Sequence, residues 1–233
     1  ASSNMATKPL ETLGMSAMQA AQSVIERSAM RRGPGFNYAV NGFRGICILL
    51  VFVYHVYNSG LLPKPPYTSS LANAFGFFAD SFRYGVELFF MISGYVIVAS
   101  LKRHASVGSF LSDRFSRIFP VWIPVHVGIF VIGVLFGLKR FHDMPLAQEA
   151  VTFFANLILL PPLIDLPVTH DGSWSLSYEW LFYLLAAAAM AVTHFRAKVG
   201  RVLLWSVWGT TVVSLLCLMP RALFFIPGAL IGL

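Results

Sequence analysis

Residues Asn41 to Tyr57 read NGFRGICILLVFVYHVY, an apolar run with an arginine near its start and a histidine near its end. Arg44 and His55 are eleven residues apart, which on a helix places them within ~20° of each other and ~16 Å apart along the axis. If Arg44 lies at a membrane boundary, His55 lies close to the midplane of a hydrocarbon core ~30 Å thick. An ionisable side chain at that depth is costly and marks a functional site by default. This stretch therefore predicts a membrane helix that carries chemistry.

The composition is that of a membrane protein. Of 233 residues, 57% are hydrophobic and 12% are charged, which is about half the charged fraction of a soluble domain. Several apolar runs reach the ~20 residues that a helix needs to cross a bilayer. We therefore predict an all-α, polytopic transmembrane helical bundle whose immediate partner is the lipid bilayer.

The net charge of +7 does not indicate a nucleic-acid partner. The Lys and Arg residues cluster in short segments between the apolar runs, as expected of cytoplasmic loops beside anionic lipid headgroups. Cys47 and Cys217 lie inside apolar runs, where a free thiol behaves as a small hydrophobic residue. The chain shows neither a disulfide framework nor the ligand spacing of a metal site.

Apolar runs and the breaks between them predict the order of the helices. Residues 1–40 are polar to mildly amphipathic, so we expect a cytoplasmic N-terminal tail before a membrane domain that covers 41–233. The predicted spans are about 44–61, 84–101, 118–138, 174–192, 202–219 and 222–233, and a shorter apolar run covers 151–163. That shorter run suits a re-entrant or tilted element, which makes six to seven spans in all. The sequence is still apolar at Leu233, so we expect the helix to continue in a longer protein.

The distribution of Lys and Arg predicts which loops share a side of the membrane. The segment before the first span and the segment 102–117 are both basic, and two spans separate them, so both are predicted to be cytoplasmic. If 151–163 crosses the membrane fully, the basic linker 194–201 lies outside. If 151–163 dips in and returns, the linker lies inside, and this second arrangement is favoured. Lys139 and Arg140 lie outside in both arrangements.

Two ionisable side chains within apolar sequence are candidates for catalysis. His55 is either a neutral structural histidine bonded to a neighbouring helix or a general base that accepts a proton from a hydroxyl group. Glu179 is flanked by tryptophans, and an unpaired carboxylate there is expensive, so we expect it to be paired with a basic group. The more specific hypothesis is that Glu179 orients His55. Glu87 either pairs with Arg83 one turn earlier or has a function of its own.

Three arginines are candidates for binding an anionic ligand. Arg114 and Arg117 are at i and i+3 and share a helix face just before the predicted third span. Each of the three, Arg44 included, also fits the excess of positive charge at cytoplasmic membrane boundaries. Together they would form a cytoplasmic clamp for a phosphorylated group, because guanidinium groups bind phosphate oxygens in bidentate fashion.

Four motifs occur in one order along the chain. They are NGFRG at 41–45 with His55 after it, GVELFFMISGY at 85–95, RFSRIFP at 114–120 and SLSYEWLFY at 175–183. Together they resemble the family-3 membrane acyltransferases, the multi-span O-acyltransferases that modify bacterial glycans, over about 40–233. The family usually has Asp where Asn41 and Glu87 stand and Tyr where Phe119 stands. These departures leave the arginine–histidine pair intact.

The resemblance implies transfer of an acyl group, often acetyl, from a cytoplasmic acyl-CoA donor to a hydroxyl of a cell-surface or periplasmic glycan. It implies that His55 is the base and that Arg44 is its functional partner. It also implies that Arg114 and Arg117 bind the donor and that Glu179 is the intramembrane carboxylate of the site.

The resemblance further implies an integral protein of a bacterial inner membrane with a cytoplasmic N-terminus. Members of the family usually have about ten spans, so we expect some C-terminal spans beyond this sequence. A homo-oligomer is compatible with the sequence.

The alternative function is a membrane transporter or lipid-linked glycan translocator, because buried Arg, His and Glu residues also describe a proton relay. Many transporters are built from inverted repeats. The charged positions in the two halves of this chain do not mirror each other, which favours the acyltransferase. A purely structural membrane protein would leave His55 and Glu179 unexplained.

Overall fold

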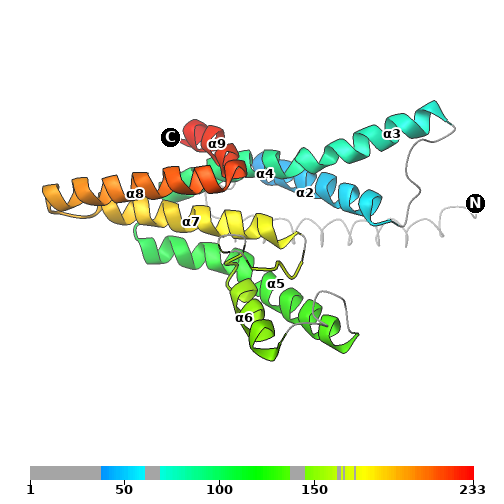
Figure 1. Ribbon diagram of the computed structural model, residues 1–233. Coiled ribbons are helices and arrows are strands. Elements are labelled where there is room, and N and C mark those ends of the chain that lie inside the picture. Colours follow the sequence, from blue (N-terminus) through cyan, green and yellow to red (C-terminus); the bar gives the residue numbers. More distant parts are fainter. Residues whose placement is uncertain (1–37, 61–68, 137–144, 162–163, 165, 171) are drawn as a thin grey trace, which may run out of the picture. The chain divides into compact units, whose positions relative to one another are not determined.

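The computed structural model describes residues 38–60, 69–136, 145–161, 164, 166–170 and 172–233 (Figure 1). In chain order the helices are α2 (Tyr38–Asn58), α3 (Ser70–Ser81), η1 (Phe82–Tyr84), α4 (Gly85–Leu101), α5 (Val107–Leu135), α6 (Leu146–Leu157), α7 (Ser173–Thr193), α8 (Lys198–Leu218), η2 (Pro220–Phe224) and α9 (Phe225–Gly232). These residues contain no strand, and the predicted all-α, polytopic bundle is confirmed. The predicted N-terminal tail lies outside the described residues except for 38–40.

The chain divides into two compact units, Ala1–Gly42 and Phe43–Leu233. The described residues of the first unit are the opening turns of α2. All packing discussed below lies within the second unit.

Five helical runs of the described residues are long and apolar enough to cross a membrane: α2, the continuous run Ser70–Leu101, α5, α7 and α8. The other two predicted apolar elements are shorter. One is α6, with 12 residues, and the other is the run Pro220–Gly232. A helix of 12 residues rises ~18 Å, which is too short for a hydrocarbon core of ~30 Å.

The second span begins earlier than predicted. We expected it to start near residue 84, because Asp80 and Arg83 interrupt the apolar run. In the structure α3 joins α4 through the single 3₁₀ turn of η1. Asp80 and Arg83 form an ion pair with 3.7 Å between Oδ2 and Nη1. Their charges therefore neutralise each other along one helix face instead of ending the helix.

The third span also begins earlier than predicted, at Val107 instead of residue 118. The hydroxyl of Ser106 caps the helix by accepting a hydrogen bond from Ser109 N at 3.3 Å. Capping by serine satisfies a backbone N–H that would otherwise have no partner. As a consequence Pro120 and Pro124 lie inside α5 instead of near its first residue.

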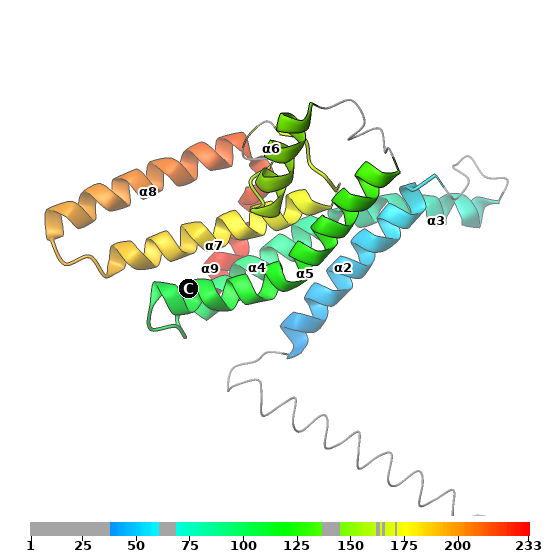
Figure 2. The same ribbon diagram turned by 90° about the horizontal axis from the view of Figure 1, so that it is seen from below.

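Helix α5 runs antiparallel to α7. The ring of Phe110 contacts Tyr183 at 6.4 Å between centroids, and further along α5 the ring of Phe119 contacts Trp180 at 5.0 Å. Figure 2 shows the two helices running side by side. The start of α5 therefore lies beside the second half of α7.

This direction places the segment 102–106 and the linker 194–197 at one end of the bundle, which we call the basic end. Such a placement agrees with the arrangement favoured from the sequence, in which both segments share a side of the membrane. That this side is cytoplasmic stays a prediction.

Helix α2 runs away from the basic end. The guanidinium of Arg44 lies 4.8 Å from the ring centre of Phe89, whereas Tyr57, near the end of α2, contacts Phe75 of α3 at 6.3 Å. Since α3 and α4 run toward the basic end, α2 is antiparallel to them. His55 thus lies farther from the basic end than Arg44 does.

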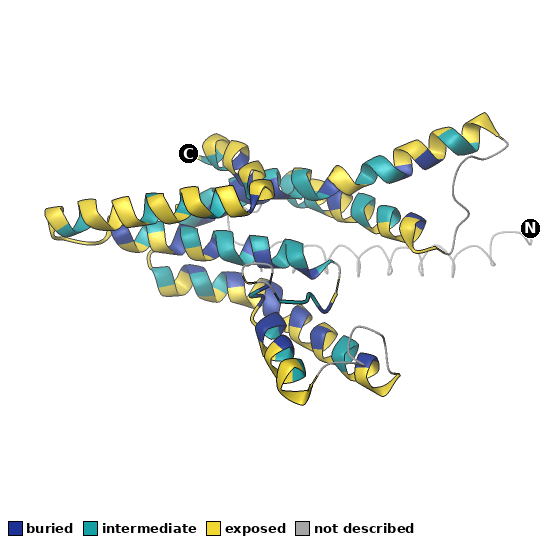
Figure 3. Cartoon of the chain, viewed as in Figure 1, coloured by how far each residue is buried: buried dark blue, intermediate teal, exposed yellow. Residues whose placement is uncertain are grey.

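The centre of the bundle is an apolar core closed by α9. Its buried residues are Phe90, Ile97, Phe110, Ile118, Phe119, Trp122, Leu159, Tyr183, Ala186, Ala187 and Phe225. The ring of Phe225 stacks on Phe90 at 4.5 Å and on Phe182 at 4.4 Å. Figure 3 shows the contrast with α8, which has no buried residue.

Glycines allow α9 to lie directly against α4. A β-carbon at Gly94 would overlap the backbone carbonyl of Phe225, and one at Gly228 would overlap that of Met91. Small residues permit such backbone contact between membrane helices. Only glycine fits at these two positions without moving a helix.

Candidate functional site

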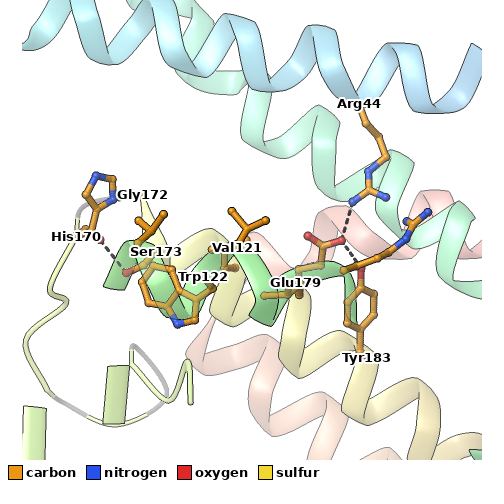
Figure 4. Close-up of a pocket in the computed structure, with 12 residues that line it drawn as sticks. Arg44, Val121, Trp122, His170, Gly172, Ser173, Glu179 and Tyr183 are labelled. Carbon is orange, nitrogen blue, oxygen red and sulfur yellow. Dashed lines mark hydrogen bonds and ion pairs between the residues drawn. The ribbon is translucent and has the colours of Figure 1, made fainter. Parts of the chain in front are cut away.

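A cavity of about 580 Å³ lies between α5 and α7. Its lining residues are Arg44, Arg117, Ile118, Val121, Trp122, Val125, His170, Gly172, Ser173, Leu176, Glu179 and Tyr183. Figure 4 shows His170, Gly172 and Ser173 on one side of Trp122 and Val121, and Glu179, Tyr183 and Arg44 on the other.

The two ends of the cavity differ in charge. Among the residues that the structure describes, the charged end is formed by Arg44, Arg117, Glu179 and Tyr183, and the end that we call neutral is formed by His170, Gly172 and Ser173. Ser173 and Tyr183 are ten residues apart on α7, which corresponds to ~15 Å along the helix. Because α7 runs toward the basic end, the charged end of the cavity is the one nearer to it.

Glu179 is the hydrogen-bonded centre of the charged end. Its Oε1 accepts a hydrogen bond from Arg44 Nη2 at 2.8 Å and another from the Tyr183 hydroxyl at 2.5 Å. The side chains of Arg44 and Glu179 are 14% and 4% exposed, so the ion pair is largely buried. The predicted need of Glu179 for a basic partner is met by Arg44.

Arg114 lies behind the charged end, not in the wall of the cavity. The side chain is buried, and Nη2 donates hydrogen bonds to Ser100 Oγ at 2.7 Å and to Asp113 Oδ2 at 2.5 Å. The guanidinium lies 5.5 Å from the ring centre of Tyr183. Nε and Nη1 of Arg114 have no hydrogen-bond partner within the part of the chain that the structure describes.

Arg117 points into the cavity instead. It is three residues after Arg114, a rotation of ~60° around the helix, which suffices to place one guanidinium in the core and the other at the cavity wall. Among the described residues that line this end, the two guanidinium groups of Arg44 and Arg117 accompany one carboxylate, that of Glu179. The charged end therefore carries an excess of positive charge.

His55 does not line the cavity. Its side chain is exposed, and its ring contacts that of the neighbouring Tyr54 at 5.3 Å between centroids. It lies on the face of α2 that carries Arg44, eleven residues farther along. The hydrogen bonds of Glu179 go to Arg44 and Tyr183, so a contact between Glu179 and His55 stays a prediction.

Glu87 has a partner that the sequence analysis did not consider. Its Oε1 lies 3.8 Å from Arg221 Nε of η2, whereas Arg83 pairs with Asp80. The Arg221 guanidinium lies 4.9 Å from the ring centre of Trp174. These groups lie outside the residues that line the cavity, so Glu87 is no part of the site described here.

The sequence analysis also missed a buried polar network beside the neutral end, which we call the amide network: His126, Asn156 and Thr169. Asn156 Oδ1 accepts a hydrogen bond from Thr169 N at 3.0 Å, and its Nδ2 donates to the carbonyls of Thr152 at 2.8 Å and Pro167 at 2.9 Å. His126 is hydrogen-bonded to the Phe153 carbonyl at 3.0 Å. The network therefore fixes the segment before α7 against α5 and α6.

The described residues contain no group of three His, Cys, Asp or Glu side chains close enough together to hold a metal ion. The side chains that line the cavity offer guanidinium, carboxylate, phenol, imidazole and hydroxyl groups. Guanidinium groups at one end suit an anionic ligand, and the apolar middle suits an uncharged chain.

Comparison with known proteins identifies several relatives of this chain. The exopolysaccharide production protein ExoZ of Rhizobium meliloti (strain 1021) is 34% identical over 163 residues, which cover 64% of this chain and 49% of that protein. An O-acetyl transferase of Shigella phage Sf6 is 29% identical, covering 64% of this chain and 44% of the relative. The acyltransferase MdmB of Streptomyces mycarofaciens is 27% identical, covering 63% and 37%.

The chain thus spans half or less of the length of the curated relatives that it matches. No solved structure matches it. Residues 37–233 match the family described as acyltransferase domain, which is more than half of the chain. The four motifs, the membrane helices and this match agree, and the chain belongs to the family-3 membrane acyltransferases.

Proposed function

We propose that the protein is a membrane-embedded O-acyltransferase that moves an acyl group, acetyl in the simplest case, from cytoplasmic acyl-CoA to a hydroxyl of a cell-surface or periplasmic glycan. The observation that carries the proposal is the cavity, with its positive end, apolar middle and neutral hydrogen-bonding end. The relatives named for O-acetyl transfer and for exopolysaccharide production support the reaction and the class of acceptor.

The charged end is the proposed site of the donor's phosphates. Arg117 offers a guanidinium at the cavity wall, and Arg44 offers the N–H donors that, within the part of the chain that the structure describes, are not used in its bond to Glu179. Arg114 does not reach the wall, and it adds positive potential from behind Tyr183. Its predicted role in donor binding is therefore electrostatic in this proposal, since Coulomb interactions persist at such distances where water is excluded.

The apolar middle is the proposed path of the donor's pantetheine arm. The ~15 Å between Ser173 and Tyr183 along α7 matches an extended linker that joins a charged head to a reactive thioester. The walls here are the apolar side chains of Ile118, Val121 and Leu176. In this proposal they limit the access of water to the thioester, and so limit wasteful hydrolysis of the donor.

His55 is the proposed general base. It accepts the hydroxyl proton while the oxygen attacks the thioester carbonyl. A C–O bond forms, the C–S bond breaks, and the leaving thiolate takes the proton from the imidazolium. Both Arg44 and His55 lie on one face of α2, and His55 is farther than Arg44 from the basic end. In this proposal a periplasmic acceptor enters from the side opposite the basic end, which is the side nearer to His55. Glu179 holds Arg44 in place for the donor.

The test is transfer of label from radiolabelled acetyl-CoA to a glycan fraction by membranes that contain the protein. We expect the His55→Ala variant to lose activity by at least ~10²-fold, the usual contribution of a general base. His194→Ala is the matched control. His194 is bonded to its own helix at Met190 O (2.7 Å) and lies outside the cavity, so we expect it to keep full activity.

Equal labelling by His55→Ala and the wild type, at equal protein levels, would show that His55 is not the base, while the proposed acyltransferase activity would still hold. No labelling by the wild type with acetyl-CoA or longer acyl donors would reject the acyltransferase. The membrane transporter or translocator would then be the function to test.

A further inference from the structure

His170 occupies the end of the cavity opposite the arginines. It belongs to the segment that connects α6 to α7, and it lines the cavity together with Gly172 and Ser173 (Figure 4). If the donor's phosphates bind Arg44 and Arg117, the reactive end of the donor points toward this neutral end. A group here meets the acceptor, not the donor's head.

The backbone of His170 is held at this place by several hydrogen bonds. Its carbonyl accepts from Ser173 N at 2.9 Å and from Ser173 Oγ at 2.8 Å. On its other side, Thr169 N donates to Asn156 Oδ1 at 3.0 Å, within the amide network. The imidazole therefore projects from a fixed backbone, which is the arrangement that precise binding of a ligand needs.

The hydrogen bonds of the ring determine which nitrogen carries the proton. Gly172 N donates to His170 Nδ1 at 3.0 Å. A nitrogen that accepts a hydrogen bond cannot carry a proton itself, so the neutral ring has its proton on Nε2. In a catalytic triad the opposite holds, because Nδ1–H donates to a carboxylate and Nε2 is free to act as base. His170 is thus arranged as a hydrogen-bond donor and not as a base.

We propose that His170 binds the acceptor. Its Nε2–H donates a hydrogen bond to an oxygen of a polyhydroxylated, uncharged substrate, a sugar ring, at the neutral end of the cavity. The inference rests on the proposed function and adds a residue that the family motifs do not contain. The two ends of the cavity then have different roles: guanidinium groups bind the donor, and the imidazole of His170 binds the acceptor.

The test separates the two substrates. Detergent-solubilised protein is given acetyl-CoA, and release of the free thiol is followed without acceptor, and then with a panel of methyl glycosides as acceptors. We expect His170→Ala to raise the KM for the glycoside roughly 2- to 12-fold, the worth of one neutral hydrogen bond. The KM for acetyl-CoA and the glycoside-independent release of thiol should not change.

A conservative variant distinguishes a donor from a base. The amide nitrogen of glutamine matches the position of Nε2, so His170→Gln keeps the donor but cannot accept the hydroxyl proton. We expect it to recover most of the wild-type KM for the glycoside. The control is His194→Gln, which makes the same chemical change at the other end of α7.

Each result has one meaning. An unchanged glycoside KM in His170→Ala overturns the inference while the proposed function stands. Failure of His170→Gln to recover the KM overturns the assignment of a hydrogen-bond donor. Thiol release by the wild type that no glycoside stimulates rejects a sugar acceptor at this end. Absence of any thiol release by the wild type rejects the proposed function itself, and the inference with it.

Discussion

Two buried polar networks lie beside the same cavity, and they differ in what they leave unpaired. In the amide network, His126, Asn156 and Thr169 each have a partner within the described residues. At the charged end, the guanidinium of Arg117 lines the cavity, and behind it two nitrogens of Arg114 have no partner among the described residues. Buried polar groups are normally satisfied, and Arg117 is a cationic group that reaches the cavity, so this is the network that we propose binds a ligand. Polarity within a membrane domain is therefore not enough to identify a functional site.

The largest expected effect comes from breaking the ion pair of the charged end. Removal of one partner leaves a buried charge unpaired, so Arg44→Met or Glu179→Met should each cost about 3–5 kcal/mol of stability and abolish acyl transfer. The double variant Arg44→Met/Glu179→Met should regain most of the stability and remain inactive. Thermal unfolding of the purified protein in detergent and the acetyl-CoA assay measure the two properties.

Stability losses that simply add in the double variant would show that Arg44 and Glu179 are not energetically coupled. The ion pair of the charged end would then not differ from the amide network in the way described above.

The next largest effect is expected from Arg117→Ala, and it should be confined to the KM for the acyl donor. Arg117 is exposed at the cavity wall, so Arg117→Ala should change stability by no more than about 0.5 kcal/mol. Loss of a hydrogen bond to a charged phosphate costs about 1.5–3 kcal/mol, and the KM for acetyl-CoA should rise roughly 10- to 150-fold. Arg117→Lys keeps the charge but not the planar guanidinium, so its KM for acetyl-CoA should lie between those of the wild type and Arg117→Ala.

The matched control for this experiment is Arg103→Ala, which removes an exposed arginine outside the cavity. Equal donor KM values for Arg117→Ala and Arg103→Ala would mean that the charged end does not bind the donor.

The smallest effect should come from the amide network. Asn156→Ala removes an acceptor for Thr169 N and a donor to two carbonyls, so we expect a loss of about 1–3 kcal/mol in stability. The KM for acetyl-CoA should stay at its wild-type value, because this network lies away from the charged end. Asn73→Ala, which removes an exposed amide bond to Ser69 O, is the control and should have little effect.

A rise in the donor KM of Asn156→Ala, in protein that is still folded, would contradict the division between the two networks. Both would then act on the same substrate.

The sequence predicted the fold class and most helices because apolar runs of bilayer length leave few alternatives. It failed where short-range chemistry extends a helix, as with the Ser106 cap of α5 and the Asp80–Arg83 pair inside the second span. Both features depend on side chains that, read one by one, also occur in loops. Helix ends are accordingly less predictable than helix cores.

The site was predicted only in part. The need of Glu179 for a basic partner follows from the cost of burying a carboxylate, but the identity of Arg44, 135 residues away, comes from tertiary packing. His170 gave no signal, because it acquires its place through Thr169 and Asn156. Glu87 paired with Arg221 for the same reason, although Arg83 is nearer in sequence.

The contact of α9 with α4 sets an order for biosynthesis. Gly94 and Phe225 touch through their backbones, yet about 130 residues separate them. At a synthesis rate of ~5–20 residues per second, Phe225 is made roughly 6–26 s after Gly94. During this time the face of Phe90 that Phe225 will cover is open to lipid or to other helices of the nascent chain. The helices made first therefore depend for their final packing on a helix that is made about 130 residues later.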